Sequence, residues 1–140
     1  MEGGILHTLD RWIESHPRWF EQLRFELEDT NDGWGPLIDR ALLSAEQVLS
    51  ELPGRDFRVV QIKEKFGALT IYFRENGMPI TASARLREIM QEVRESSLCI
   101  CEVCGASAHL GRDGGHFCVR CVSCAPKGWE KFRIDGSSAT

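Results

Sequence analysis

Five of the six cysteines lie between residues 101 and 124, at spacings that could hold a metal ion. They form three overlapping C-x-x-C pairs: Cys101/Cys104, Cys118/Cys121 and Cys121/Cys124. A structural Zn²⁺ site takes four soft ligands in a tetrahedron, and C-x-x-C pairs supply thiolates two at a time. In a reducing compartment such clusters more often bind metal than form disulfides. The sequence therefore predicts one structural zinc ion bound by four thiolates.

The stretch CEVCG at residues 101–105 supplies the first ligand pair, Cys101 and Cys104. Gly105 directly after the second cysteine permits the backbone turn that aims amides at the sulfurs. The chain then contains Asp113-Gly114-Gly115, which is a favourable hairpin turn. We expect the second ligand pair to lie beyond that hairpin.

Two pairs compete for the second half of the site, namely Cys121/Cys124 and the alternative Cys118/Cys121. Both leave spacings that fit zinc ribbons. We favour Cys121/Cys124 because Cys118 falls in the middle of a predicted strand over residues 116–120, where a knuckle cannot form. A short helix predicted over residues 126–132 would then follow Cys124 and give a treble-clef-like layout.

The remaining cysteine and the histidines are interpreted as ordinary residues. Cys99 is expected to be a buried small hydrophobe at the end of a long helix. His109 and His116 could replace a cysteine ligand, but five local thiols make that less favoured. His7 and His16 lie on amphipathic segments without partners, so surface or core positions explain them.

No catalytic constellation is visible in the sequence. There is no nucleophile elbow, no phosphate-binding loop and no H-x-E ahead of P-C-x-x-C, as zinc deaminases require. A zinc ion with four protein ligands also has no open position for water. We expect no catalysis. The enzyme alternative is an HNH-like treble-clef nuclease, which needs a histidine-rich stretch where this chain has only His109 and His116.

The elements that must position the cysteines follow from hydrophobic periodicity. Apolar residues at helical spacing predict N-terminal helices and one long later helix, over residues 5–15, 18–29, 36–52 and 83–97. Two alternating segments around Phe66-Gly67 predict a β-hairpin over residues 57–74. Trp34 between the helices is expected in the core.

The predicted fold class is α+β, with N-terminal helices and a long helix packed on a small antiparallel β-hairpin or sheet. A C-terminal treble-clef or zinc-ribbon-like module follows. The predicted domains are an α+β body with an acidic helical N-terminus, a zinc-binding module and a flexible tail, at residues 1–98 (1–32 acidic), 99–132 and 133–140. Because the apolar stripes of the body do not involve the cysteines, we expect the body to fold independently of the module.

Composition and charge limit the functional classes. With 42% hydrophobic and 27% charged residues among 140, the chain has globular composition. No apolar run reaches membrane-spanning length, and the acidic N-terminus lacks the basic region of a signal peptide, so we expect a cytoplasmic protein. The net charge is −4, and residues 1–32 carry eight acidic against three basic residues, a balance of −5. General nucleic-acid binders show a basic footprint instead.

Three stretches, GWGPLID, VVQIKEKFGALTIYF and CEVCG, resemble small uncharacterised proteins of phages, prophages and bacteria. Those proteins share a QIKEKFG-L-F/Y strand pair and a C-terminal CxxCG…CxxC/H zinc-ribbon or treble-clef element. The likeness covers about residues 33–125 and implies Cys121/Cys124 as the second pair. Where relatives end that pair in His this chain has Cys124, which changes only the ligand type. The resemblance carries no activity, and it implies the host cytoplasm if the chain is phage-encoded.

We therefore expect a non-catalytic zinc-binding interaction protein, such as a phage-encoded inhibitor or modulator of a host protein. The acidic N-terminal helices would suit a basic host protein as partner. The alternative is a nucleic-acid-binding zinc module, in which Trp129 could stack on a base and the cations would be Arg112, Arg120, Lys127, Lys131 and Arg133. Nucleic acid is less favoured, no membrane partner is expected, and a homodimer is compatible with the sequence.

Overall fold

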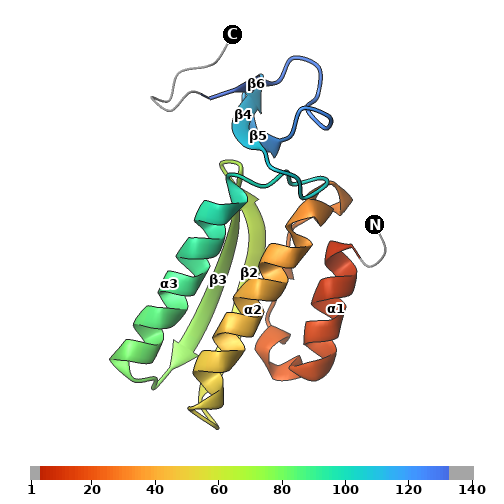
Figure 1. Cartoon of the computed structure of the whole chain (residues 1–140). Helices are drawn as coiled ribbons and strands as arrows, with labels where there is room; N and C mark the ends of the chain where they lie inside the picture. The colour runs from red at the N-terminus through yellow and green to blue at the C-terminus, as the bar shows by residue number, and fades with distance from the viewer. Residues whose placement is uncertain (1–3, 133–140) are drawn as a thin grey trace.

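The computed structural model describes residues 4–132 as a sheet covered by helices, with a smaller module at one end (Figure 1). The helices α1 (Ile5–Ser15), α2 (Gly35–Ser50) and α3 (Ile80–Ser97) pack side by side. The larger sheet has the order β1-β2-β3, formed by Arg24–Phe25, Asp56–Lys65 and Ala68–Asn76. The smaller sheet has the order β5-β4-β6, with β4 (His109–Asp113), β5 (His116–Arg120) and β6 (Glu130–Lys131). The predicted α+β class is confirmed.

The helices bury the stripes that the periodicity predicts. Helix α2 starts with Pro36 in its first turn, where the missing N–H has no helical partner to lose. Its buried side chains recur at helical spacing and are Leu37, Ile38, Ala41, Leu42 and Ala45. In α3 the buried stripe is Leu86, Ile89, Met90 and Val93, which faces β3 and α2. Helix packing against one sheet face therefore forms the main core.

The predicted β-hairpin is confirmed as β2 and β3. Val59 lies opposite Phe73 and Ile62 opposite Ile71, so both pairs contribute to the face that packs on the helices. A bulge between Val59 and Gln61 inserts one extra residue. The bulge shifts the alternation of β2 and keeps apolar residues inward on both sides of it.

The helix predicted over residues 18–29 is wrong. The chain forms a 3₁₀ turn, η1 (Pro17–Phe20), and then the short strand β1, which pairs in parallel with β2 at Gln61 and Ile62. Pairing with β1 satisfies backbone groups on the edge of β2, which would have no strand partner if this segment were helical. These strand hydrogen bonds outweigh the modest helix propensity of the segment. Phe20 and Leu27 are nevertheless buried, as their apolar spacing indicated.

The turn between β2 and β3 brings the hairpin tip against the module. Phe66 and Gly67 both have positive φ, 52° and 88°, as a two-residue hairpin turn requires. A Cβ at Gly67 would lie 2.5 Å from Leu110 Cδ1 of β4, so the backbone approaches β4 closely. The Phe66 ring meets Phe117 of β5 edge-on at 6.4 Å between centroids.

The smaller sheet confirms the predicted hairpin around Asp113-Gly114-Gly115, but the helix predicted over residues 126–132 is wrong. Gly128 has φ of 92°, which breaks a helix, and β6 instead pairs with the free edge of β4. Trp129 packs against Gly111, where a Cβ would lie 2.6 Å from Trp129 Cζ2, and its Nε1 donates to the Cys118 carbonyl. The module is therefore a three-stranded ribbon.

The expected burial of Cys99 is also wrong, because this side chain is exposed. The buried position at the end of α3 belongs to Ser97, which is fully buried. Its hydroxyl accepts a hydrogen bond from the Leu69 N–H and donates one to the Arg94 carbonyl. Ser97 thus occupies the inward register position and leaves Cys99 pointing to solvent.

The module is joined to the body through the 3₁₀ segment η2 (Asp29–Trp34). Trp34 is fully buried, as expected, and its indole N–H donates to the Ile100 carbonyl at 3.1 Å. The Gly33 N–H donates to the Glu102 carbonyl at 2.8 Å. Cys101 and Val119 of the module belong to the same buried core as the helices. These contacts oppose the expected independence of body and module, while the predicted domain boundaries themselves stay a prediction.

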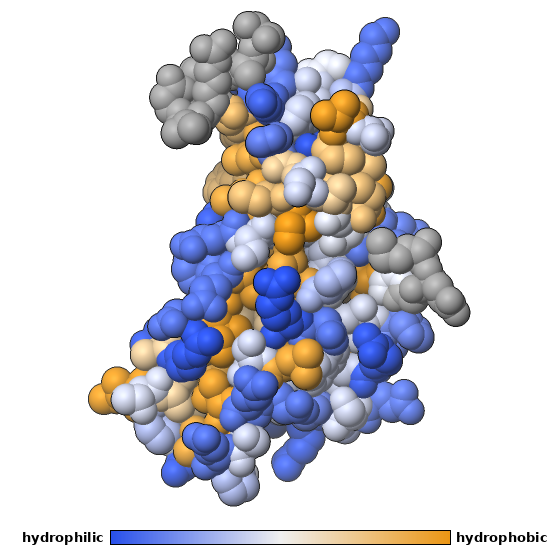
Figure 2. Space-filling model, viewed as in Figure 1, coloured by the Kyte–Doolittle hydropathy of each residue, from blue (hydrophilic) through white to orange (hydrophobic). Residues whose placement is uncertain are grey.

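Surface character differs between the two ends of the molecule. Figure 2 shows hydrophilic side chains over much of the helical body and hydrophobic surface around the module. Phe66 at the hairpin tip is 68% exposed and Val122 is 96% exposed. The flexible tail predicted for residues 133–140 lies outside the described residues. Within residues 4–132, no helix has both the length and the apolar character needed to cross a membrane.

Gly33→Ala should strongly destabilise the protein, because the added Cβ would overlap the Cys101 carbonyl and lie 2.6 Å from the Gly105 nitrogen. Both obstacles are backbone atoms, so we expect a loss of about 3 kcal/mol or more in the free energy of unfolding. Gly115→Ala is the matched control, since its Cβ would meet no atom within 4 Å. Equal urea midpoints for the two variants would contradict this docking of the module.

Candidate metal centre

The two C-x-x-C pairs form matching turns. In the first, the Gly105 N–H donates to the Cys101 carbonyl at 2.9 Å, and in the second the Ala125 N–H donates to the Cys121 carbonyl at 2.9 Å. Each turn therefore folds both of its cysteines back toward the same side. Gly105 has φ of 84°, a conformation that glycine adopts without strain and that the first turn requires.

The turns bring the sulfurs of Cys101, Cys104, Cys121 and Cys124 together, all within 4.8 Å of one another. The Cys104 and Cys121 sulfurs are 3.6 Å apart, which is far longer than the roughly 2 Å of a disulfide. In a tetrahedral Zn–S₄ centre with bonds of about 2.3 Å, neighbouring sulfurs lie about 3.8 Å apart. The spacing therefore matches thiolates around one metal ion. The four cysteines are positioned to bind a metal.

The proton affinities of these thiols reflect their crowding. Desolvation acts to raise the pKa of Cys121, but hydrogen bonds from the Cys124 N–H and from the neighbouring thiols outweigh it and lower the pKa to about 7. Sharing a proton with Cys121 raises the pKa of Cys124 to about 12. The Ala106 N–H bonds to Cys104 and acts to lower its pKa, but interactions with Cys121 and desolvation raise it overall. Because thiolates are the metal ligands, binding of a divalent cation at these sulfurs would release their protons.

A buried carboxylate, Glu102, holds the two turns in place. It lies between the first two cysteines and is 5% exposed. One oxygen, Oε1, accepts the Val119 N–H at 3.0 Å and the Arg120 Nε–H at 3.3 Å. The other accepts the Asn31 side-chain amide at 2.7 Å. Glu102 therefore connects η2, the first turn and β5.

Arg120 extends this connection to the second turn, because its Nη1 donates to the Cys124 carbonyl at 3.2 Å. Burial raises the pKa of Glu102, while the charge and hydrogen bonds of Arg120 and the Val119 N–H oppose that rise. Sequence reasoning did not identify Glu102 as a structural residue. The available signal was a pair of opposite charges, Glu102 between the first two cysteines and Arg120 directly before Cys121.

The other candidate ligands lie apart from this group. Cys118 is in the middle of β5, 2% exposed, and burial raises the pKa of its thiol. His109 and His116 occupy opposite ends of the β4–β5 hairpin, and neither belongs to the sulfur group. Within residues 4–132, the four cysteines are the one cluster of metal-ligating side chains found. The structure thus brings together the favoured set, and of the alternative pair Cys118/Cys121 only Cys121 belongs to the sulfur group.

No protein-family model, curated protein or solved structure matches this chain. Of the resemblance to small phage and bacterial proteins, the cysteine cluster is what the structure supports. Functional inference must therefore come from the residues themselves.

Glu102→Ala should cost about 3–5 kcal/mol in unfolding free energy, because it leaves the Arg120 guanidinium and the Asn31 amide without their acceptor in a buried site. Asn31→Ala, which removes the bond to Glu102 and the bond that Asn31 Oδ1 accepts from the Glu28 N–H, should cost about 1–3 kcal/mol. The control is Glu92→Ala on the exposed face of α3, with an expected change within about 0.5 kcal/mol. Denaturant unfolding of the metal-loaded proteins measures all three. An effect of Glu102→Ala no larger than the control would refute the connecting role.

Proposed function

We propose that this chain is a non-catalytic interaction protein whose C-terminal module is held together by one structural Zn²⁺. The observation that carries the proposal is the group of four sulfurs within 4.8 Å of one another. An all-thiolate, tetrahedral donor set suits Zn²⁺ or a single iron and is a poor site for Mg²⁺ or Ca²⁺, which take oxygen ligands. Backbone N–H groups of Ala106 and Cys124 directed at the sulfurs complete the environment of a metal-thiolate centre.

A structural rather than catalytic role follows from the ligand count. Four cysteine ligands saturate a tetrahedral ion and leave no position for a substrate or an activated water. Glu102, the nearest buried carboxylate, is fully engaged by Asn31, Val119 and Arg120. His109 and His116, which an HNH-like nuclease would need at the metal, lie outside the sulfur group. These contacts favour a role of the four cysteines and Glu102 in stabilising the fold.

Intramolecular contacts of the candidate nucleic-acid-binding residues make the nucleic-acid alternative less favoured. Arg120 is bound to Glu102 and to the Cys124 carbonyl, so it is not available to a phosphate. Trp129 is half-buried against Gly111 and bonds to Cys118, so it does not offer a free stacking face. Arg133 lies outside the described residues. We therefore propose a protein as partner, consistent with a modulator of a host protein.

The expected basic partner at the acidic N-terminal segment stays a prediction from sequence. Several of these carboxylates already serve the fold. Asp32 accepts the Ile5 N–H at the start of α1, Glu21 pairs with Arg58, and Glu26 pairs with Arg24. These engagements reduce the charge that the segment can offer to a partner.

Protein purified without chelator should contain one zinc per chain, and Cys121→Ser should abolish this content because Cys121 is one of four required ligands. Cys99→Ser and Cys118→Ala are the controls and should keep one zinc, since Cys99 is exposed and Cys118 lies outside the sulfur group. Elemental analysis measures the stoichiometry and separates zinc from iron. Loss of metal from Cys118→Ala with retention in Cys121→Ser would overturn the ligand set.

The interaction role is tested by affinity capture from the native host with zinc-loaded protein. We expect a protein partner whose capture survives nuclease treatment and is competed by excess untagged chain. Metal-dependent cleavage of plasmid DNA by the purified protein would contradict the non-catalytic role. Capture that disappears on nuclease treatment would favour the nucleic-acid alternative.

A further inference from the structure

Strand β3 leaves one of its edges without a partner strand among the described residues. The larger sheet has the order β1-β2-β3, so β3 hydrogen-bonds to β2 on one side only. The strand has nine residues, Ala68–Asn76; the Leu69 N–H is taken by the Ser97 hydroxyl, and residues 72–76 are the exposed or half-buried part of the strand. An open edge of this kind presents a row of backbone N–H and C=O groups that can pair with another extended chain.

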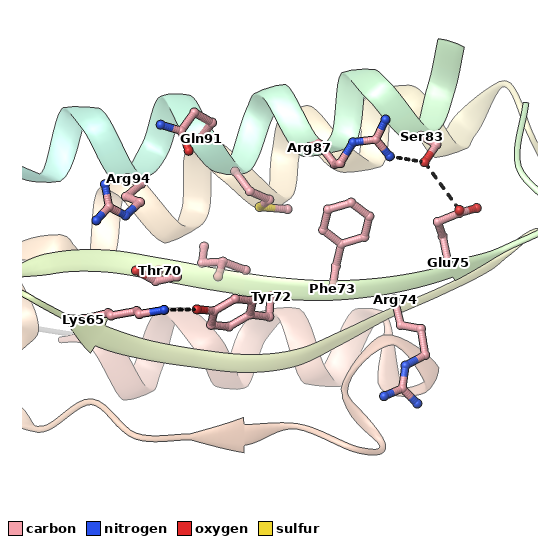
Figure 3. A pocket seen from close by; sticks show the side chains of 12 residues that line it. Lys65, Thr70, Tyr72, Phe73, Arg74, Glu75, Ser83, Arg87, Gln91 and Arg94 are labelled. Atoms are coloured by element: carbon pink, nitrogen blue, oxygen red, sulfur yellow. Dashed lines mark hydrogen bonds between the residues drawn. The ribbon is translucent and has the colours of Figure 1, made fainter. Parts of the chain in front are cut away.

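A groove of about 620 Å³ runs between this edge and α3 (Figure 3). Six consecutive residues of β3, 70–75, line it. Successive side chains of a strand point to opposite faces, so an uninterrupted run of lining residues places the groove along the backbone edge itself. Helix α3 forms the opposite wall, from which Arg94 projects toward the strand, while Arg87 runs along the helix and its Nη1 donates to the Ser83 hydroxyl at 2.8 Å (Figure 3).

The groove is cationic although the chain as a whole is acidic. Four basic side chains line it, Lys65, Arg74, Arg87 and Arg94, and none of them belongs to an ion pair found within residues 4–132. The single lining carboxylate, Glu75, is occupied by the Met78 N–H and the Ser83 hydroxyl. The lining therefore carries four positive charges against the one negative charge of Glu75.

Apolar side chains lie beneath these cations. Ile71 and Phe73 of β3 and Met90 of α3 line the groove together with the basic residues. Arg87 and Arg94 are seven residues apart on α3, about 10 Å along the helix axis. An extended peptide lying along β3 would meet backbone groups on one side, and it would meet separated positive charges and apolar contacts on the other.

We infer that this groove binds an acidic, extended segment of a partner protein, which adds to β3 as a further strand alongside α3. The inference rests on the proposed role as an interaction protein and specifies the chemistry of the partner at this surface. Strand addition of this kind uses main-chain hydrogen bonds for affinity and flanking side chains for specificity. Acidic side chains on the segment would pair with Arg87 and Arg94.

Two other occupants fit less well. A second copy paired edge to edge through β3 would bring two sets of four unpaired cations together, and such like-charge contact is unfavourable. Single-stranded nucleic acid would match the charge but not the backbone donors and acceptors of a strand edge. It would also need free aromatic faces for stacking, whereas Phe73 is half-buried against α3 and the Lys63 ammonium lies over the ring of the exposed Tyr72, 5.8 Å from its centroid.

The test is selection from a phage-displayed library of random peptides about twelve residues long against the zinc-loaded full chain. Enriched peptides should alternate acidic and apolar residues. The double variant Arg87→Gln/Arg94→Gln should weaken binding of an enriched peptide about ten-fold or more, and added salt should weaken wild-type binding. Hydrogen exchange should show new protection of amides in residues 70–75 when that peptide is bound.

Arg85→Gln is the matched control, because Arg85 lies on the same helix but pairs with Glu88 and Glu92 outside the groove. It should leave peptide binding unchanged. Equal binding by the control and the double variant would overturn the inference. The inference would also be overturned if no peptide were enriched or if basic peptides were enriched. Tighter binding of a (dT)₂₀ oligonucleotide than of the enriched peptide would contradict it as well. So would a dimer, detected by sedimentation, that is lost when residues of β3 are substituted.

These outcomes are separable from failure of the proposed function. The groove variants should keep one zinc per chain and the wild-type unfolding midpoint, since Arg87 is exposed and Arg94 is only half-buried. A partner captured through another surface would preserve the interaction role and reject the groove. Peptide binding by a chain that holds no zinc would reject the structural metal and preserve the groove.

Discussion

The buried Glu102 carboxylate is the constraint on which the arrangement of body and module depends. A charge taken out of water must be matched by donors, and here the donors come from Asn31, Val119 and Arg120. These residues belong to η2 and β5, which are far from one another in sequence. Because Arg120 also bonds to the carbonyl of Cys124, satisfying one carboxylate fixes the position of the second cysteine pair. The four sulfurs converge as a consequence of that network as well as of the two local turns.

Metal binding at the four cysteines would be coupled to folding in a module of this size. The smaller sheet has strands of five, five and two residues, and few of its side chains are fully buried. Such a small apolar core stabilises little on its own, which is why modules of this kind commonly use a metal ion. The body contributes further stability. Trp34 bonds to the Ile100 carbonyl just before the first cysteine turn, Gly33 bonds to the Glu102 carbonyl within it, and Gly67 lies against Leu110. Contacts with the body and a bound metal ion would therefore both stabilise the module.

Charge is distributed in a way that net charge does not reveal. The acidic N-terminal segment places carboxylates such as Asp32 and Glu21 in intramolecular contacts. The unpaired charge of the β3–α3 groove is positive, with Arg87 and Arg94 on its helical wall. An interaction protein with these features would recognise its partner through a local cationic surface, against the negative charge of the whole chain. The four-cysteine module, if it holds a metal ion, would act by keeping the sheet and helices in one rigid arrangement.

The sequence by itself determined the features that depend on close neighbours along the chain. Helical periodicity located α1, α2 and α3, and alternation located the β2–β3 hairpin. The C-x-x-C spacing identified Cys101 and Cys104 and left two candidate pairs for the rest of the four-cysteine cluster. A mid-strand position correctly separated Cys118 from that cluster. Each of these signals acts over a few residues. Over that range the geometry of a helix, strand or turn decides which side chains point in the same direction.

Only the tertiary structure decided the features that depend on distant partners. The segment around Arg24 became a strand because the edge of β2 was open to it, and the segment around Glu130 became a strand because β4 was. Glu102 gained its importance from Asn31, 71 residues away in the sequence. The free edge of β3 likewise exists only because of the order of strands in the sheet. Backbone groups and buried charges take whichever partners the fold brings near, and no local pattern encodes which partners those will be.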